Sequence, residues 1–200
     1  MDSAQAQFWN RLVPVSGNGC DISVQWSDPR QGAQEIHKGC IAASTIDDGK
    51  VSDDEDIVCS LESLLSEFRR IALMIEPHCE GFRARVVSSR GTAGTRCPLW
   101  HCDYVPVRWI QSLVGPGCEY VASEQGVDRW LLNQWAGGDE DDRIINNRRV
   151  RPGVADIRSG DTGAAVVLRG RDSTKLPCIH KSPVLSPGEG RVLLTLDIDH

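Results

Sequence analysis

The sequence predicts a mainly β fold of the α+β class, a jelly-roll (cupin-like) barrel with one long bracing helix. Short segments rich in β-branched residues recur after residue 82, and glycine- and proline-containing turns separate them. A segment before them instead repeats apolar residues at helical spacing. The length of 200 residues suits one domain, with strands and loops over 1–50, a helix over 53–74 and the barrel over 82–200.

The N-terminal region predicts one half-buried strand. Apolar and polar residues alternate from Asp21 to Trp26, and Ser27–Gly32 carries the residue types of a turn. The helix over 53–74 follows, with Ser52 as its N-cap and an acidic first turn that complements the helix dipole. Its apolar stripe consists of Ile57, Leu61, Leu64, Leu65, Phe68, Ile71 and Ala72.

The barrel strands are expected over residues 82–88, 99–104, 107–113, 118–122, 164–168 and 191–198. We expect loops at 91–94 and 137–142. In the last strand, Val192, Leu194, Leu196 and Ile198 share one face, and Arg191, Leu193, Thr195 and Asp197 share the other.

Composition and charge narrow the expected partners. The net charge of −6 argues against general nucleic-acid binding, and no apolar stretch is long enough to span a bilayer. The basic residues gather in the last third of the chain, which favours a small anionic ligand there. The N-terminus has no signal-peptide pattern and the eight cysteines form no C-x-x-C pair, so we expect reduced thiols and a cytoplasmic protein.

The most informative motif is His101-Cys102-Asp103, which is followed much later by His180. Residues i and i+2 of a strand point to one face, so His101 and Asp103 could hold one ion together with His180. Two imidazoles and one carboxylate with open positions suit non-haem Fe(II) chemistry. The alternative is that H-x-D occurs by chance and that these histidines are ordinary surface or core residues.

Other side chains extend this candidate site. Arg191 could hold an anionic co-substrate beside the metal, with Thr195 on the same face. The candidates for a substrate pocket are Trp100, Tyr104, Arg108 and Trp109. Cys102 and Cys178 are alternative ligands for a zinc site, although Cys102 would point away from its neighbours on a regular strand.

The segment from Cys97 to Arg108 resembles an uncharacterised family catalogued as domain of unknown function 1826. Blocks Gly115–Gly117, Gly160–Asp161, Arg169–Gly170, Ile179–Pro183 and Arg191–Thr195 are also similar to that family. The chain departs from the pattern at Ser112-Leu113, at Gly117-Cys118 and at Lys181. The resemblance implies no established activity, but members look like companions of metal-handling GTPases, which favours a zinc-related role.

The order H-x-D, a long gap, His and then Arg191 also resembles the Fe(II)/2-oxoglutarate oxygenases. This resemblance implies a double-stranded β-helix in which His101, Asp103 and His180 hold iron. It also implies that Arg191 pairs with the distal carboxylate of 2-oxoglutarate. Leu193 stands where that superfamily often has Ser or Thr.

Four functions stay open from the sequence. The first is an Fe(II)/2-oxoglutarate oxygenase acting on a small-molecule or amino-acid-like substrate. The others are a non-catalytic, cupin-like protein that binds zinc or another metal and serves metal homeostasis, an interaction module, and a metal-dependent hydrolase. No G-x-S-x-G or phosphate-loop motif is present. The substrate, the oligomeric state and the pathway are not evident from the sequence.

Overall fold

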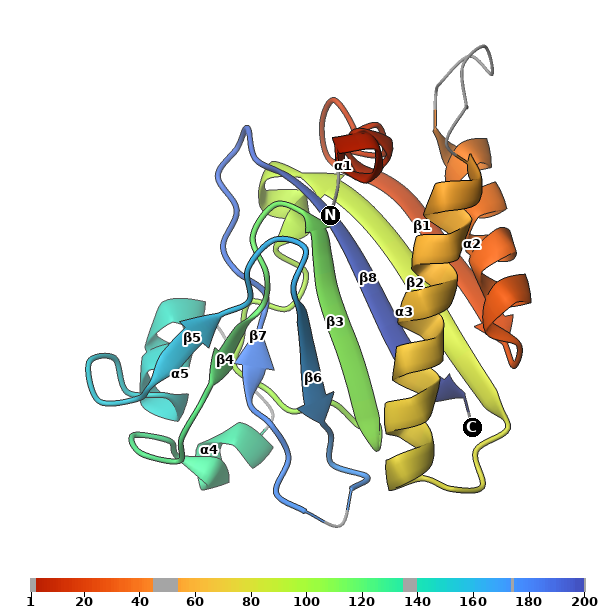
Figure 1. Ribbon diagram of the computed structural model, residues 1–200. Helices are drawn as coiled ribbons and strands as arrows, with labels where there is room; N and C mark the ends of the chain where they lie inside the picture. Colours follow the sequence, from red (N-terminus) through yellow and green to blue (C-terminus); the bar gives the residue numbers. More distant parts are fainter. Residues whose placement is uncertain (1–2, 45–53, 135–139, 174, 200) are drawn as a thin grey trace.

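Two antiparallel sheets form the framework of the chain (Figure 1). The computed structural model describes residues 3–44, 54–134, 140–173 and 175–199. The larger sheet has the strand order β1 (Asn18–Trp26), β2 (Gly81–Arg90), β8 (Gly190–Asp199), β3 (Val107–Val114) and β6 (Ala165–Arg169). The smaller sheet has the order β5 (Ile157–Ser159), β4 (Glu119–Val121) and β7 (His180–Lys181).

Three helices contribute to the main core on one face of the larger sheet: α1 (Ser3–Asn10), α2 (Pro29–Ala43) and α3 (Asp54–Ile75) (Figure 1). The helix predicted over 53–74 is therefore confirmed as α3, while Ser52 and Asp53 lie outside the described residues. Its apolar stripe packs against the inner residues of β1, β2 and β8, and Leu65, Phe68 and Ala72 are fully buried.

Helix α2 corrects the expectation of strands and loops over residues 1–50. The strand over 21–26 is present within β1, but the presumed turn after it is the start of a helix. Asp28 accepts a hydrogen bond from the backbone N–H of Gln31, and Pro29 is the first helical residue. Asp-Pro is a helix-start signal as well as a turn signal, and only the packing against α3 and β1 decides between the two.

Strand β8 has the two faces that the sequence predicts. Val192, Leu194 and Leu196 are fully buried in the core beneath the helices. On the opposite face, Leu193 packs with Ile110 of β3, Leu168 of β6, Cys118 and Cys178. Cys118 and Cys178 adjoin strands of the smaller sheet, so this second face of the larger sheet looks toward the smaller sheet.

Several other segments differ from the expectation. Residues 99–104 do not form a regular strand; His101 alone makes an isolated antiparallel bridge with His180. Residues 91–94 form a 3-10 helix, η1 (Gly91–Gly94). The expected loop over 137–142 lies partly outside the described residues, and Asp142 begins helix α5 (Asp142–Arg149), which follows the short α4 (Arg129–Asn133).

The strand pairs are nested along the chain, so that each pair lies between the two members of the pair before it in the sequence. β2 pairs with β8, the bridge joins His101 to His180, β3 pairs with β6, and β4 pairs with β5. Among the described residues no hydrogen-bonded strand is shared by the two sheets, so a closed barrel is not observed. The observed class is mixed α and β, dominated by antiparallel sheets. None of the helices in the described ranges has the length and apolar character needed to cross a bilayer.

Candidate metal centre

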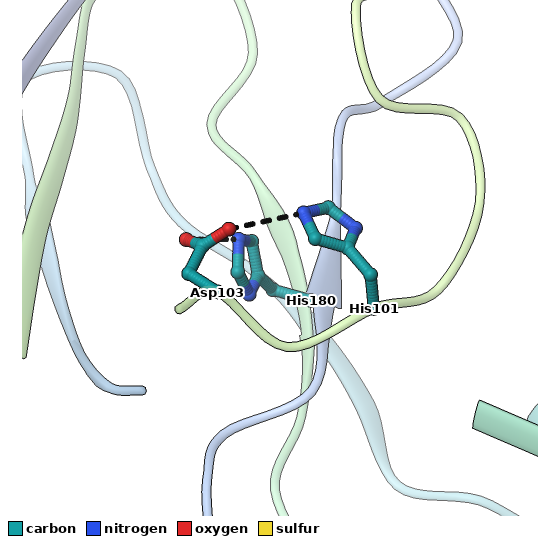
Figure 2. A group of neighbouring side chains, drawn as sticks. All are labelled: His101, Asp103 and His180. Atoms are coloured by element: carbon teal, nitrogen blue, oxygen red, sulfur yellow. Dashed lines mark ion pairs between the residues drawn. The ribbon is translucent and has the colours of Figure 1, made fainter. Parts of the chain in front are cut away.

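His101, Asp103 and His180 come together at one point (Figure 2). One ligand atom from each of the three lies within 4.8 Å of the others. Nε2 of His101 is 3.4 Å from Oδ1 of Asp103, and Nε2 of His180 is 3.1 Å from Oδ2 of Asp103. In the part of the chain that the structure describes, this is the one group of His, Cys, Asp and Glu with such geometry.

These separations fit a single transition-metal ion. Two nitrogen or oxygen ligands about 2.1 Å from an ion and at right angles to one another lie about 3.0 Å apart. The two imidazole–carboxylate distances are close to that value. Nδ1 of His180 is buried without a hydrogen-bond partner, and buried Oδ2 of Asp103 has only ion-pair contacts, with Nε2 of His180 and Nη1 of Arg108, although such atoms normally make hydrogen bonds. An ion at this point would satisfy the carboxylate oxygen.

The backbone bridge brings the two histidines together. The N–H of His101 donates to the carbonyl of His180 at 3.0 Å, and the N–H of His180 donates back at 3.0 Å. Asp103 is fixed from another side, because its carbonyl accepts from the N–H of Arg171 at 2.8 Å. One isolated bridge and one loop contact therefore bring the three side chains together, and a regular strand is not involved.

Helix α5 holds the segment that precedes His101. Asn146 accepts from the N–H of Trp100 at 2.8 Å and donates to the carbonyl of Pro98 at 2.9 Å. Arg149, which is buried, donates to the carbonyl of Trp100 at 2.9 Å. These three hydrogen bonds replace the strand ladder that the segment lacks.

The hydrogen bond on the other side of the His101 ring leaves Nε2 free to act as a ligand. Nδ1 of His101 lies 2.7 Å from the carbonyl of Leu99. A carbonyl only accepts, so the proton belongs on Nδ1 and the lone pair on Nε2 faces Asp103. Metal-binding histidines are commonly oriented in this way.

Arg108 joins Asp103 to Asp197 on β8. Its Nε and Nη2 bond both oxygens of Asp197 at 2.6 and 2.7 Å, and its Nη1 lies 2.9 Å from Oδ2 of Asp103. Burial opposes ionisation of Asp103, but the adjacent imidazoles of His101 and His180 and the charge of Arg108 outweigh burial. The pKa of Asp103 is therefore held well below its usual range, and the carboxylate is ionised and ready to bind a cation.

Arg191 is a buried cation without a carboxylate partner among the described side chains. Its Nε lies 3.1 Å from the carbonyl of Pro116 and 3.5 Å from Oγ of Ser112, and its Nη1 lies 3.4 Å from the carbonyl of Gly94. Burial lowers the pKa of Arg191. Taking an unpaired guanidinium out of water is costly, so this arrangement suits an anionic ligand.

Thr195 lies on the same face of β8 as Arg191, four residues further along. Four residues of strand span about 13 Å, which is too far for both side chains to hold one carboxylate. This corrects the expectation that the two act together. Ser112 takes that place beside Arg191, and no local motif indicates this residue, because its position depends on the β3–β8 register.

Two aromatic residues expected in the substrate pocket are packing residues. Trp109 lies against the main core, on the opposite face of β3 from Arg108. Trp100 is buried with Leu132, Val150 and Ile179 in a second core cluster.

Of the other two pocket candidates, Arg108 contacts the metal centre, whereas Tyr104 contacts Arg171. Tyr104 is 75% exposed next to Asp103, with the guanidinium of Arg171 5.0 Å from its ring centre. Arg108 is occupied by two carboxylates, so it orients Asp103 and is not free to bind a substrate.

Neither alternative cysteine ligand joins the three-residue group. The thiol of Cys102 lies 3.6 Å from Nη1 of Arg129 and packs in the second core cluster. Cys178 accepts from the N–H of Arg169 and packs with Ile110 and Leu168. Cys102 therefore points away from the side chains of His101 and Asp103, as the sequence predicts, although the segment is not a regular strand.

Solved structures similar to this chain include oxygenases, all at low identity. A dioxygenase for auxin oxidation from rice has a TM-score of 0.46 and 12% identity, covering 99% of this chain and 64% of that one. Dioxygenase for auxin oxidation 1 from Arabidopsis thaliana, in complex with 2-oxoglutarate, has a TM-score of 0.43 and 11% identity, covering 96% and 71%. Hydroxypropylphosphonic acid epoxidase from S. wedmorenis has a TM-score of 0.31 and 9% identity, covering 58% and 42%. This chain thus spans less than two thirds of the rice enzyme and of the epoxidase.

No curated protein matches the sequence. A family model does match, over residues 44–197, and that range includes the three candidate ligands and Arg191. The match covers most of the chain, and the chain therefore belongs to the family described as protein of unknown function (DUF1826).

Proposed function

We propose that this protein is a non-haem Fe(II) oxygenase that uses 2-oxoglutarate to oxidise a small-molecule or amino-acid-like substrate. The observation that carries the proposal is the occurrence of two features that both lie within electrostatic range of the Cys118 thiol. His101, Asp103 and His180 form a two-His, one-carboxylate set, and Arg191 is a buried cation that lacks a carboxylate among the described residues. A metal that keeps open positions and a buried guanidinium together suit a chelating dicarboxylate.

The nested strand order supports a jelly-roll core. In a jelly roll, the first strand pairs with the eighth, the second with the seventh, the third with the sixth and the fourth with the fifth. If the residue at His101 counts as the second strand, the pairs β2–β8, His101–His180, β3–β6 and β4–β5 follow that order. We propose this double-stranded β-helix as the core, with β1 added at the edge of the larger sheet.

Each residue has a separate task in the proposed site. His101, Asp103 and His180 would hold the ion, and Arg108 keeps the carboxylate of Asp103 ionised and oriented. Arg191, with Ser112 beside it, would receive the distal carboxylate of 2-oxoglutarate. When bound, Fe(II) and 2-oxoglutarate supply the coupled oxidation of 2-oxoglutarate to succinate and CO₂ and of a substrate by O₂.

The test is the addition of 2-oxoglutarate to the Fe(II)-loaded protein under argon. A chelate gives a metal-to-ligand charge-transfer band in the visible spectrum, and admission of air should release succinate. Arg191→Met, which retains much of the side-chain volume, should lose the band at 2-oxoglutarate concentrations that saturate the wild type while retaining the metal. Absence of both the band and succinate in the wild type would rule out the proposal.

A second candidate is a non-catalytic zinc-binding protein. The same three donors are ones that Zn²⁺ accepts, and they leave one tetrahedral position open. In that case the purified protein would contain zinc, and Arg191→Met would not change any property of the metal site. Metal analysis of protein prepared without chelators separates the two candidates.

A further inference from the structure

The face of the larger sheet that carries Arg191 and Asp197 continues onto β2 and β1 as a charged surface. Directly paired residues of neighbouring strands share a face, so Arg85, paired with Thr195 of β8, belongs to this face. Asp21 of β1 is paired with Val87, two residues after Arg85, and is on the same face. Arg85 and Asp21 are both partly exposed to solvent.

Two arginines share the single carboxylate of Asp21. Nε and Nη2 of Arg85 bond its two oxygens at 2.8 and 2.7 Å, and Nη1 of Arg96 lies 3.6 Å from Oδ2. The two cations and one anion leave one formal positive charge. The hydrogen bond from Arg85 holds the pKa of Asp21 below its usual value.

This cationic group lies next to the candidate metal centre. Arg85 and Arg108 occupy successive rows of the sheet, because Arg85 is paired with Thr195 and Arg108 with Asp197. Successive rows on one face are about 7 Å apart, and β2 and β3 flank β8 about 10 Å from one another, so the Cα atoms of these two arginines are about 12 Å apart. Their charges interact, and Arg108 reaches Asp103.

The segment that carries Arg96 is also tied to this region. The thiol of Cys97 lies within electrostatic range of both Asp103 and Arg96. The carbonyl of Cys97 accepts from the N–H of Ser182, two residues after His180, at 2.8 Å.

We propose that Arg85 and Arg96 bind an anionic group of the substrate, a carboxylate or a phosphate, while the rest of that substrate reaches the metal centre. The inference rests on the proposed function, because it takes the metal centre as the place of oxidation. Asp21 marks the position: its carboxylate already sits where the two guanidinium groups converge. A substrate anion can bind beside Asp21, since Arg85 uses only Nε and Nη2 for that carboxylate and Arg96 is held only at 3.6 Å.

The experiment measures binding of small probes to the full chain at about 0.01 M ionic strength, where charges are weakly screened. The probes are phenyl phosphate, benzoate and the neutral benzyl alcohol. Calorimetry is done under argon, once with metal-free protein and once with protein saturated with Mn(II) and 2-oxoglutarate. The variants are Arg85→Gln, Arg96→Gln and Asp21→Asn, and the matched control is Arg70→Gln, an exposed arginine of an ion pair on α3.

We expect one of the two anionic probes to bind more tightly than benzyl alcohol, which also identifies the preferred anion. Arg85→Gln and Arg96→Gln should each weaken that binding by about tenfold, the scale of one charge-assisted hydrogen bond. Asp21→Asn should strengthen it severalfold, a gain that misfolding cannot produce. Arg70→Gln should leave it unchanged.

Two results would overturn the inference. One is equal affinity for the charged and neutral probes. The other is anion binding that is lost in Arg191→Met but insensitive to the changes at residues 21, 85 and 96, because the probe would then occupy the Arg191 site. If the chain takes up no 2-oxoglutarate but these three variants still change probe affinity in metal-free protein, the proposed function fails and the anion site stands.

Discussion

Asn146 of helix α5 should control metal affinity without touching the metal. Its side chain makes two hydrogen bonds to residues 98–100, the segment that leads into His101 and has no regular strand ladder. Asn146→Ala removes both bonds and leaves the N–H of Trp100 unsatisfied in a residue that is only 3% exposed.

The expected cost follows from these two bonds. Each is worth about 1 kcal/mol net, so the free energy of unfolding should fall by about 2 kcal/mol. For a chain of this length that loss lowers Tm by about 4–8 °C. Because the orientation of His101 then depends on a looser segment, metal affinity should fall by about 10–100-fold, the range found for residues that orient metal ligands.

The assay is competition for Fe(II) or Co(II) with a chromophoric chelator, done alongside thermal unfolding. Asn147→Ala is the matched control, because Asn147 is the exposed neighbour in the same helix. It should change neither metal affinity nor Tm appreciably. An Asn146→Ala protein with lower Tm but wild-type metal affinity would refute the idea that α5 positions His101.

Three further changes have defined outcomes. Arg191→Met should weaken 2-oxoglutarate binding by about 100-fold while Tm stays level or rises, because it removes a buried cation without a carboxylate partner among the described residues; a large fall in Tm would contradict this. Gly115→Ala should lower the free energy of unfolding by about 2 kcal/mol or more in urea titrations. Gly115 has φ +76°, and a Cβ there would lie 2.3 Å from the carbonyl oxygen of Gly190; unchanged stability would contradict the geometry. Because the hydrogen bond from Arg85 depresses the pKa of Asp21, its ion pair contributes stability above the unfolded-state pKa of about 3.9. That contribution is lost as the pH falls through the lower folded-state pKa, so the stability difference between wild type and Asp21→Asn should shrink below about pH 4 and not above it.

The sequence predicted the elements whose periodicity is strong. The apolar stripe of α3 and the alternation of β8 each depend on many residues, so no single contact decides them. Helix α2 was missed because Asp28-Pro29 is equally a turn signal, and only tertiary packing separates the two. The strand expected at 99–104 was wrong because the segment is held by side chains of α5, which lie more than forty residues away.

The candidate ligands could be found in the sequence because two imidazoles and one carboxylate are the donor set of a known class of metal site. The residues that hold the ligands and Arg191 in place could not be found from the sequence. The contacts of Ser112, Asn146 and Arg149 depend on the strand register and on where a helix docks, which carry no local motif. Trp109 was wrongly expected in the pocket for the same reason. It is near the motif in sequence, but its side chain is on the opposite face of β3, against the main core.

We expect three side chains that are distant along the chain to hold one divalent ion. The most direct measurement is the amount of Fe(II) retained per chain after gel filtration under argon, for wild type, His180→Ala, Asp103→Ala and the exposed control His78→Ala. We expect one equivalent in the wild type and in His78→Ala, and none in the other two variants. A full equivalent retained by His180→Ala would mean that His180 is not a ligand and that the ion is held elsewhere.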